Sequence, residues 1–165
     1  MRAETNYYWG LNQSATVFYS QIHQESNWNP EAQSKYASGL AQFTPQTAEW
    51  ISKLYAKDLG ENKPLDARWA IRACLKYDKF LYEKFIQSYS SDDRWRFTLS
   101  SYNGGYGWVL KDQKLTESKG RDSSKWICNV EHYSNRAQWA FKENRDYPFK
   151  ILNKWYPVYE TGGFK

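Results

Sequence analysis

A recurring helical spacing of apolar residues constrains this fold most, because no stretch shows a convincing strand alternation. Phe18, Ile22 and Glu25 follow i, i+4, i+7 spacing, which places them on one face of a helix over residues 14–27. A residue that precedes proline is pushed out of the helical region, so Pro30 is expected to end this helix. The sequence therefore predicts a mostly α-helical protein.

Start and stop signals divide the rest of the chain into further helices. Thr44 and Pro45 supply an N-cap and a first helical residue, and Gly60 fits the end of that segment. The other expected helices cover 65–85, a segment capped by Ser91 or Asp92 that ends at 102–105, 106–115, and 134–156 with an interruption at Pro148. A short β-hairpin fits residues 34–43 or 125–133.

The length of 165 residues suits one domain with a hydrophobic core, so we expect a single domain over 1–165. No stretch approaches the roughly 20 apolar residues that a membrane-spanning helix needs. Residues 1–22 lack the apolar region of a signal peptide, so we expect a protein that is made in the cytoplasm without one.

Charge and aromatic content narrow the class of partner. Lys and Arg total 23 against 18 Asp and Glu, a net charge of +5 that favours an anionic partner such as nucleic acid, a membrane surface or an acidic cell-wall polymer. No run of basic residues concentrates this charge, which argues against nucleic acid. The 9 Trp and 14 Tyr offer flat apolar faces with polar edges, which suit a groove for sugar rings or stacked bases.

The cysteines and histidines give no sign of a metal or a cofactor. Two cysteines, Cys74 and Cys128, are too few for a disulfide framework, and two thiols are expected rather than a bridge. Cys74 falls in a helical pattern and is expected to be buried. His23 and His132 lie far apart in sequence and show no metal-ligand spacing, so we expect no metal site and no cofactor.

Glu25 has a physical reason to act as a general acid. It shares the inward face of its helix, and burial raises the pKa of a carboxyl group by disfavouring the charged form. The partly negative end of the helix dipole acts in the same direction. A carboxyl group that stays protonated near neutral pH can protonate a leaving oxygen. On this position alone, a solvent-facing glutamate at a helix end remains the simpler interpretation.

Four short motifs give Glu25 a context. They are Glu25-Ser26, Gly39-Leu40-Ala41-Gln42, Ser101-Tyr102-Asn103 and Phe141-x-Glu143-Asn144-Arg145-x-Tyr147. In this order they resemble the E-S, G-L-M-Q, A-Y-N and F-x-E-T-R-x-Y patterns of the soluble (SLT) lytic transglycosylases, a branch of the lysozyme-like superfamily. The resemblance implies a mostly α, lysozyme-like fold with a motif-bearing core over about 12–156. The chain departs from the family at Ala41, Ser101, Asn144 and Pro148.

The resemblance also implies a role for each matched residue. Glu25 corresponds to the single catalytic acid and base. The substrate-binding positions are Ser34, Gln42, Tyr102, Asn103 and Tyr147, and the positions of structural support are Ser26, Glu143 and Arg145, with Glu143 and Arg145 as a pair that holds one corner together. Ala41 has no explanation in these terms. The tract 108–140 forms either a cleft wall or a loop without a role.

The implied reaction cleaves the bond between N-acetylmuramic acid and N-acetylglucosamine in peptidoglycan and leaves a 1,6-anhydromuramoyl end. Hydrolysing glycosidases use two carboxylates. The acids that follow Glu25, Glu31 and Glu49, are expected at the surface, so no second carboxylate is evident. The implied partner is a peptidoglycan glycan strand, and the protein is expected to bind it as a monomer. Neither nucleic acid nor a membrane is expected as a partner.

Other interpretations stay open. A hydrolytic lysozyme of the same fold would draw a second acid from Glu117, Asp122 or Glu131. A wall-binding or virion structural module would keep the fold without catalysis, and a nucleic-acid binder has only charge and aromatics in its favour. The resemblance is closest in kind to a phage endolysin released through a holin, and a tail-associated or secretion-system lysin fits as well. In each case the site of action is the periplasm or cell wall.

Overall fold

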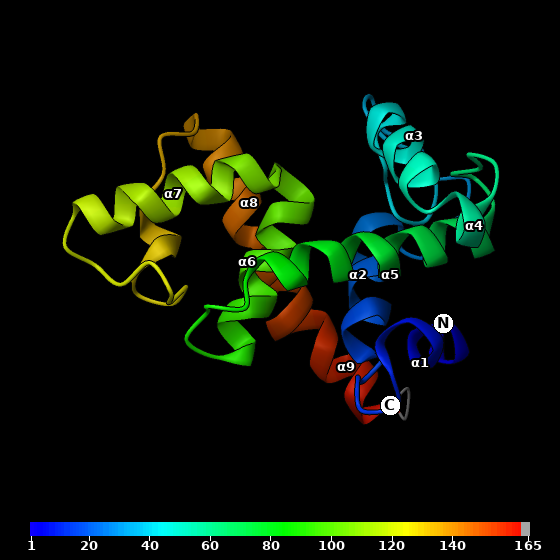
Figure 1. Ribbon diagram of the computed structural model, residues 1–165, viewed down its shortest axis with the longest axis horizontal. Helices are drawn as coiled ribbons and strands as arrows, with labels where there is room; N and C mark the ends of the chain where they lie inside the picture. Colours follow the sequence, from blue (N-terminus) through cyan, green and yellow to red (C-terminus); the bar gives the residue numbers. More distant parts are fainter. Residues whose placement is uncertain (163–165) are drawn as a thin grey trace. The chain divides into compact units, whose positions relative to one another are not determined.

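The computed structural model describes residues 1–162 and consists mainly of helices (Figure 1). In chain order they are α1 (Arg2–Trp9), α2 (Thr16–Ser26), α3 (Pro45–Leu54), α4 (Ala56–Leu59), α5 (Ala67–Lys84), α6 (Ser91–Gly104), α7 (Tyr106–Ser118), η1 (Val130–His132), α8 (Gln138–Phe149), η2 (Lys150–Trp155) and α9 (Tyr156–Thr161). Within residues 1–162, extended pairing consists of two antiparallel bridges, Gln33–Ser38 and Ser38–Phe43. The mostly α expectation is confirmed, and the pairing falls in the first of the two expected hairpin segments.

The chain forms two compact units. Unit 1 comprises Met1–Tyr77 and Ile151–Lys165, and unit 2 comprises Asp78–Lys150. Helix α5 carries the chain from the first unit into the second, and the chain returns where η2 begins. That 1–165 acts as one catalytic domain stays a prediction.

Unit 1 is built around α2. The side chains of Phe18 and Ile22 are fully buried, as their helical spacing predicts. The helix ends earlier than expected, because Asn27 adopts a left-handed φ of 51° and Trp28 a φ of 65°. These two residues turn the chain away before Pro30 is reached, so the expectation that proline ends the helix is wrong.

Helix α1 also belongs to unit 1, and the apolar spacing did not predict it. Its Trp9 donates its indole N–H to the carbonyl of Leu75 in α5 at 3.0 Å. Glu4 accepts from Arg72 of α5 at 3.0 Å. Tertiary contacts of this kind stabilise a short helix whose own sequence carries a weak signal.

Unit 2 has its own apolar core, which contains Phe85, Phe97, Val109, Trp126 and Val130. Helix α6 packs against both α7 and α8. The N-cap of α6 is Ser90, one residue before the first expected candidate, Ser91. The Ser90 hydroxyl accepts the backbone N–H of Asp93 at 3.0 Å.

The end of the chain contains a change of helix type. Pro148 lies inside α8 rather than ending it, and the following residues form the π-helix η2. Proline has no backbone N–H and therefore removes one i→i−4 hydrogen bond, which favours a local change of winding. The expected interruption thus appears two residues later, as wider winding rather than as a break.

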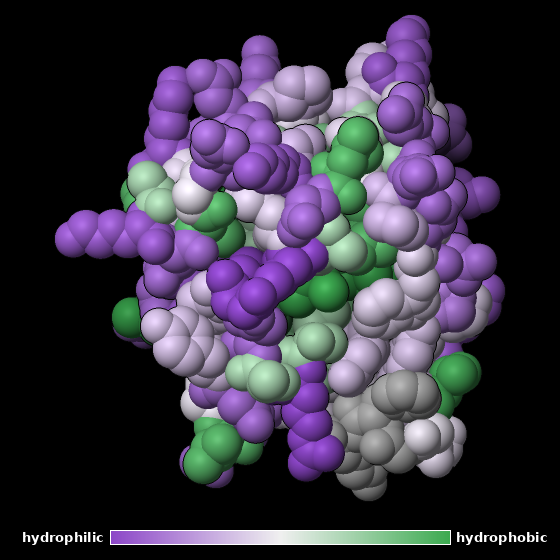
Figure 2. Space-filling model, turned by 90° about the vertical axis from the view of Figure 1, so that its right-hand side faces the viewer, coloured by the Kyte–Doolittle hydropathy of each residue, from purple (hydrophilic) through white to green (hydrophobic). Residues whose placement is uncertain are grey.

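None of the helices within the described range is long and apolar enough to cross a bilayer. Figure 2 shows the side of α3 and α4, where a band of hydrophobic residues lies between larger hydrophilic areas.

The two cysteines are free thiols. Cys74 is buried as expected, Cys128 is exposed, and no disulfide joins them in the part of the chain that the structure describes.

Candidate active site

Glu25 lies in the last turn of α2 and is half-buried. It follows Phe18 and Ile22 on the helix face that packs inward. The next residue, Ser26, donates its hydroxyl hydrogen to the carbonyl of Ile22 at 3.2 Å, within the same helix. The carboxyl group therefore belongs to the last turn of the helix, one residue before its end at Ser26.

Residues of η2 and α9 pack against α2 and the residues that follow it. The ring of His23 stacks on Trp155 with centroids 3.8 Å apart, and its Nδ1 lies 2.8 Å from the hydroxyl of Tyr159. Trp28 donates its indole N–H to the same hydroxyl at 2.5 Å. Trp155 donates to the side-chain oxygen of Gln24 at 2.9 Å. Burial, assisted by Lys154, lowers the pKa of His23, so this cluster contains a neutral imidazole.

The loop after α2 folds back on itself and fixes Gln42. The side-chain amide of Gln42 donates to the carbonyl of Ala32 at 3.1 Å and to that of Gly39 at 2.9 Å. Its backbone has a φ of 46°, and Gly39 has a φ of 76°. These two bonds engage the amide nitrogen of Gln42 and do not involve its amide oxygen.

Ser34 also has a structural task in this loop. Its hydroxyl oxygen accepts the backbone N–H of Ala37 at 3.0 Å and donates to the carbonyl of Ala37 at 3.2 Å. The turn borders a groove of about 890 Å³ in unit 1. The groove is lined by Gln33, Ser34, Lys35, Tyr36, Ala37, Ser38, Pro45, Asn62, Lys63, Pro64, Leu65 and Asp66. Ser34 therefore stands at the edge of a space large enough for a small ligand.

The other carboxylates of unit 1 are exposed or engaged elsewhere. Glu31 is exposed, as expected, and so is Glu49, which pairs with Lys53 at 2.6 Å. The remaining contacts are Glu4 with Arg68 and Arg72, Asp58 with Lys76, Glu61 with Lys63, and Asp66 with the backbone N–H of Trp69. Glu160, in α9, is exposed as well.

Unit 2 brings together the residues of the third and fourth motifs. The rings of Tyr102 in α6 and Tyr147 in α8 lie parallel, with centroids 6.3 Å apart. Asn103 accepts from the side-chain amide of Asn144 at 3.1 Å. Exposed Glu143 lies beside Asn103 in the lining of a pocket of about 400 Å³, which also contains Trp108 and Trp139.

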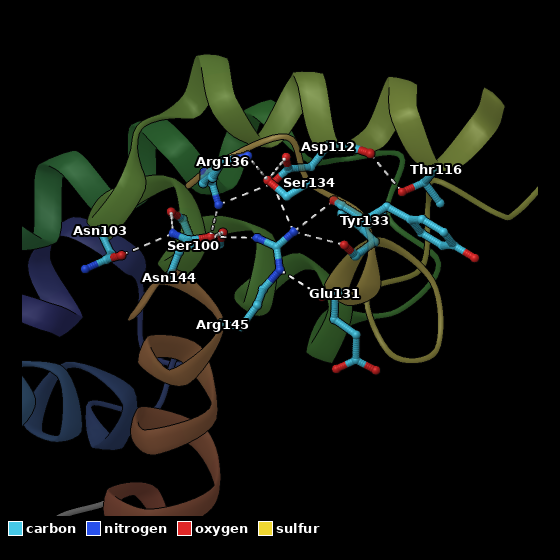
Figure 3. A network of polar contacts seen from close by, with 11 residues as sticks. Ser100, Asn103, Asp112, Thr116, Glu131, Tyr133, Ser134, Arg136, Asn144 and Arg145 are labelled. Atoms are coloured by element: carbon cyan, nitrogen blue, oxygen red, sulfur yellow. Dashed lines mark hydrogen bonds and ion pairs between the residues drawn. The ribbon is translucent and has the colours of Figure 1, made fainter. Parts of the chain in front are cut away.

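A buried ion network holds this corner of unit 2 (Figure 3). The carboxylate of Asp112, in α7, lies 3.0 Å from Arg145 Nη2 and 3.2 Å from Arg136 Nη1. Ser134 donates to the same carboxylate at 2.7 Å. The Asp112 side chain is only 1 % exposed, so both cations meet it out of contact with water. Burial lowers the pKa of both guanidinium groups, and Asp112 opposes that shift.

Asn144 connects this network to α6. Its side-chain oxygen accepts from Ser100, Arg136 and Arg145, and its amide nitrogen donates to the Ser100 carbonyl and to Asn103. A side chain at Gly104 would lie 2.5 Å from the Asn144 nitrogen, so glycine permits this close approach. Asn144, where the family pattern has threonine, therefore has a structural role in linking α6 to the buried ion network.

The expected pairing of Glu143 with Arg145 differs from the geometry. Arg145 takes Asp112 as its carboxylate partner, whereas Glu143 is exposed and lines the pocket of about 400 Å³. Asp112 and Arg136 were not expected to take part, because each lies in the tract 108–140, between the third and fourth motifs. Pairing across 24 and 33 residues leaves no local spacing signal for them. Nothing in the structure explains Ala41.

The fold and the candidate site together indicate the class of protein. A helical chain with a glutamate at the end of a buried helix, followed by a Gly-Leu-Ala-Gln loop, is lysozyme-like. The model of the "Transglycosylase SLT domain" family matches residues 6–125, and the chain belongs to this family. The match includes Glu25, Ser34, Gln42, Tyr102 and Asn103, and ends before the fourth motif.

Relatives are similar over part of their length. A membrane-bound lytic murein transglycosylase F of Shewanella woodyi is 37 % identical over 105 residues, which cover 63 % of this chain and 20 % of the relative. The protein of the same name from Aeromonas hydrophila is 31 % identical over 128 residues, covering 76 % of this chain and 24 % of the relative. The chain thus spans about a quarter or less of these relatives.

Solved structures agree on the fold. The 70 kDa soluble lytic transglycosylase of Escherichia coli superposes with a TM-score of 0.68 at 25 % identity, over 96 % of this chain and 24 % of that one. A complex of the 70-kDa soluble lytic transglycosylase with bulgecin A gives the same TM-score at 26 % identity, with the same coverage. The expected lysozyme-like transglycosylase fold is confirmed.

Proposed function

We propose that this chain is a peptidoglycan lytic transglycosylase domain that uses Glu25 as its single acid and base. The observation that carries this proposal is the family match over residues 6–125, which includes Glu25 at the half-buried end of α2. An enzyme with one suitable carboxylate fits a reaction that needs no water-activating base.

In the proposed reaction, Glu25 donates a proton to the glycosidic oxygen between N-acetylmuramic acid and N-acetylglucosamine. The N-acetyl group of the substrate stabilises the positive charge at C1. Glu25, now a carboxylate, removes the proton of the muramoyl C6 hydroxyl, and that oxygen bonds to C1. Both protons are accounted for on one side chain, and the product carries a 1,6-anhydro bond.

The proposed substrate-binding residues are Ser34, Gln42, Tyr102, Asn103 and Tyr147. Gln42 supports this role through its amide oxygen, since its N–H groups hold the loop. Asn103 and Tyr147 are each fixed by a neighbour, Asn144 and Tyr102 respectively. Ser26 and Arg145 act as structural residues, and Glu143 is proposed to face the ligand side of its pocket rather than to pair with Arg145.

The proposed partner is the glycan strand of peptidoglycan, bound by a monomer. Because peptidoglycan lies outside the cytoplasmic membrane, the domain acts in the periplasm or cell wall. Release through a holin, delivery with a virion and action as an endolysin remain predictions. Light scattering coupled to gel filtration tests the monomer.

The experiment digests purified peptidoglycan sacculi and analyses the muropeptides by mass spectrometry. We expect anhydromuramoyl ends, lost in Glu25→Gln and retained in Glu31→Gln, which alters an exposed carboxylate six residues away. Reducing ends would favour a hydrolytic lysozyme instead. Glu117, Asp122 and Glu131 would be its candidate acids, and each already accepts a local hydrogen bond.

A turbidity assay on cells stripped of their outer membrane separates catalysis from binding. We expect lysis by the native protein and none by Glu25→Gln. Equal clearing by a folded Glu25→Gln variant would refute the role of Glu25, and no clearing by either protein would favour a wall-binding or virion structural module.

A further inference from the structure

Three potential metal ligands gather on the turn that follows Trp126. Cys128 Sγ, a carboxylate oxygen of Glu131 and a ring nitrogen of His132 all lie within 4.8 Å of one another. The expectation of no metal site compared the two histidines and overlooked Cys128, four residues before His132. The cluster lies outside the proposed cleft residues and outside the part of the chain that the family model matches.

The ligand atoms are already close to a metal-binding arrangement. Glu131 Oε1 accepts the backbone N–H of Cys128 at 2.6 Å and lies 3.5 Å from His132 Nε2. A tetrahedral zinc ion, with bonds of about 2.0–2.3 Å, holds its ligand atoms roughly 3.3–3.8 Å apart. A contraction of about 1 Å at the widest pair is within reach of side-chain rotation, and Cys128 and His132 are exposed, so they rotate without repacking.

The backbone beneath the cluster is fixed from within unit 2. Arg145 donates to the carbonyls of Glu131 and Val130 at 3.0 Å each, and to that of Tyr133 at 3.2 Å. Val130 is fully buried in the apolar core. A site on a held backbone loses little conformational entropy when a ligand binds, which favours binding.

The donor set selects the kind of ion. A thiolate and an imidazole with one carboxylate suit zinc, whereas Mg²⁺ and Ca²⁺ prefer oxygen donors alone. We propose that Cys128, Glu131 and His132 bind a single Zn²⁺ ion, with water as the fourth ligand. The Cys128 thiol loses its proton to solvent when the ion binds, because the thiolate is the ligand.

The ion would link Cys128, at the start of this turn, to Glu131 and His132 at its end. Asn129, which lies between the ligands, accepts the backbone N–H of Asp122 through its side-chain oxygen at 3.1 Å. Zinc would therefore strengthen the loop over 121–133, and a ligand that binds only the folded state raises the melting temperature. This role is independent of peptidoglycan cleavage.

The test uses the full chain, stripped of metal and kept reduced, with Co²⁺ as a spectroscopic substitute for Zn²⁺. We expect one equivalent of Co²⁺ to give a thiolate-to-cobalt charge-transfer band and the visible bands of a tetrahedral ion, both abolished by Zn²⁺. Zn²⁺ should also raise the melting temperature. The absence of a thiolate band in the native protein would overturn the proposal.

Variants locate the ion. Cys128→Ser should remove the charge-transfer band. His132→Gln should weaken Co²⁺ binding by at least about 100-fold, because it removes a direct ligand and the loss of an outer-shell partner alone already costs about 10–100-fold. Cys74→Ala removes the buried thiol of α5 and serves as the matched control, which should keep the band. A band that survives Cys128→Ser, or that disappears in Cys74→Ala while circular dichroism shows a folded chain, would overturn the assignment.

Discussion

Replacing Asp112 with asparagine removes a carboxylate that faces two buried guanidinium groups in unit 2. Asp112→Asn keeps the shape of the side chain, so the change is one of charge rather than of volume. The Arg136 and Arg145 side chains are 3 % and 11 % exposed, and water cannot replace the missing charge. Both cations keep their protons, because arginine is not deprotonated in proteins.

The magnitude follows from the burial of the pair. Removing one partner of a buried ion pair destabilises a protein by about 3–5 kcal/mol. Asparagine still offers one oxygen to the guanidinium groups, so we expect the lower limit, about 3 kcal/mol. With a urea m-value of about 2 kcal/mol/M, the unfolding midpoint should fall by about 1.5 M.

The assay is urea unfolding followed by far-ultraviolet circular dichroism. Asp146→Asn is the matched control: it makes the same charge change in unit 2, where Lys150 lies 3.7 Å from Asp146 and both side chains are almost half exposed. An exposed pair of this kind contributes less than about 1 kcal/mol. Equal midpoint shifts for Asp112→Asn and Asp146→Asn would refute the argument that the buried charge holds this corner.

Two further predictions concern unit 1. The pKa of His23 is lowered in the folded state, so the unfolded chain binds more protons at acidic pH. The stability that the neutral imidazole contributes should be complete above about pH 6.5 and should decline as the pH falls below that value. The melting temperature of the native protein should therefore fall more steeply between pH 7.5 and pH 5 than that of His23→Gln, and parallel curves would contradict this. Gly39→Ala should destabilise by roughly 3 kcal/mol, because φ is 76° and a Cβ atom would overlap the Pro64 carbonyl. Gly60→Ala, with a φ of 65° and open space around it, should cost only about 1–2 kcal/mol in the same urea assay, and an equal loss would rule out the close approach.

Much of the fold was predictable because it rests on local signals. Apolar spacing predicts the buried face of α2 and the helix α5, and the capping residue Thr44 predicts the start of α3. The observed end of α2, Ser26, lies one residue before the expected end at 27, but the expected cause was wrong. Asn27 and Trp28 end the helix by adopting left-handed backbone conformations, which proline rules do not reveal. Helix α1 was missed because it depends on contacts with α5, 66 and 68 residues away.

The site was predictable to the extent that it follows motifs. The positions of Glu25 and Gln42 came from such patterns, and the loop geometry adds which atoms of Gln42 are engaged. The network around Asp112 was not predictable, because its members come from three separate segments and meet only after folding. The expected pairing of Glu143 with Arg145 failed for a different, local reason: two residues that are two positions apart on a helix lie on different faces.

The split of unit 1 across the sequence bears on how the protein is made. Trp155 and Tyr159, which pack on α2, are added 131 to 136 residues after Gln24, Trp28 and His23, the residues they contact. At a synthesis rate of about 5–20 residues per second, the ribosome needs on the order of 10 s for that interval. Unit 2 is continuous in sequence and is complete at that point. The helix that carries Glu25 therefore gains these packing partners only after the whole of unit 2 has been synthesised.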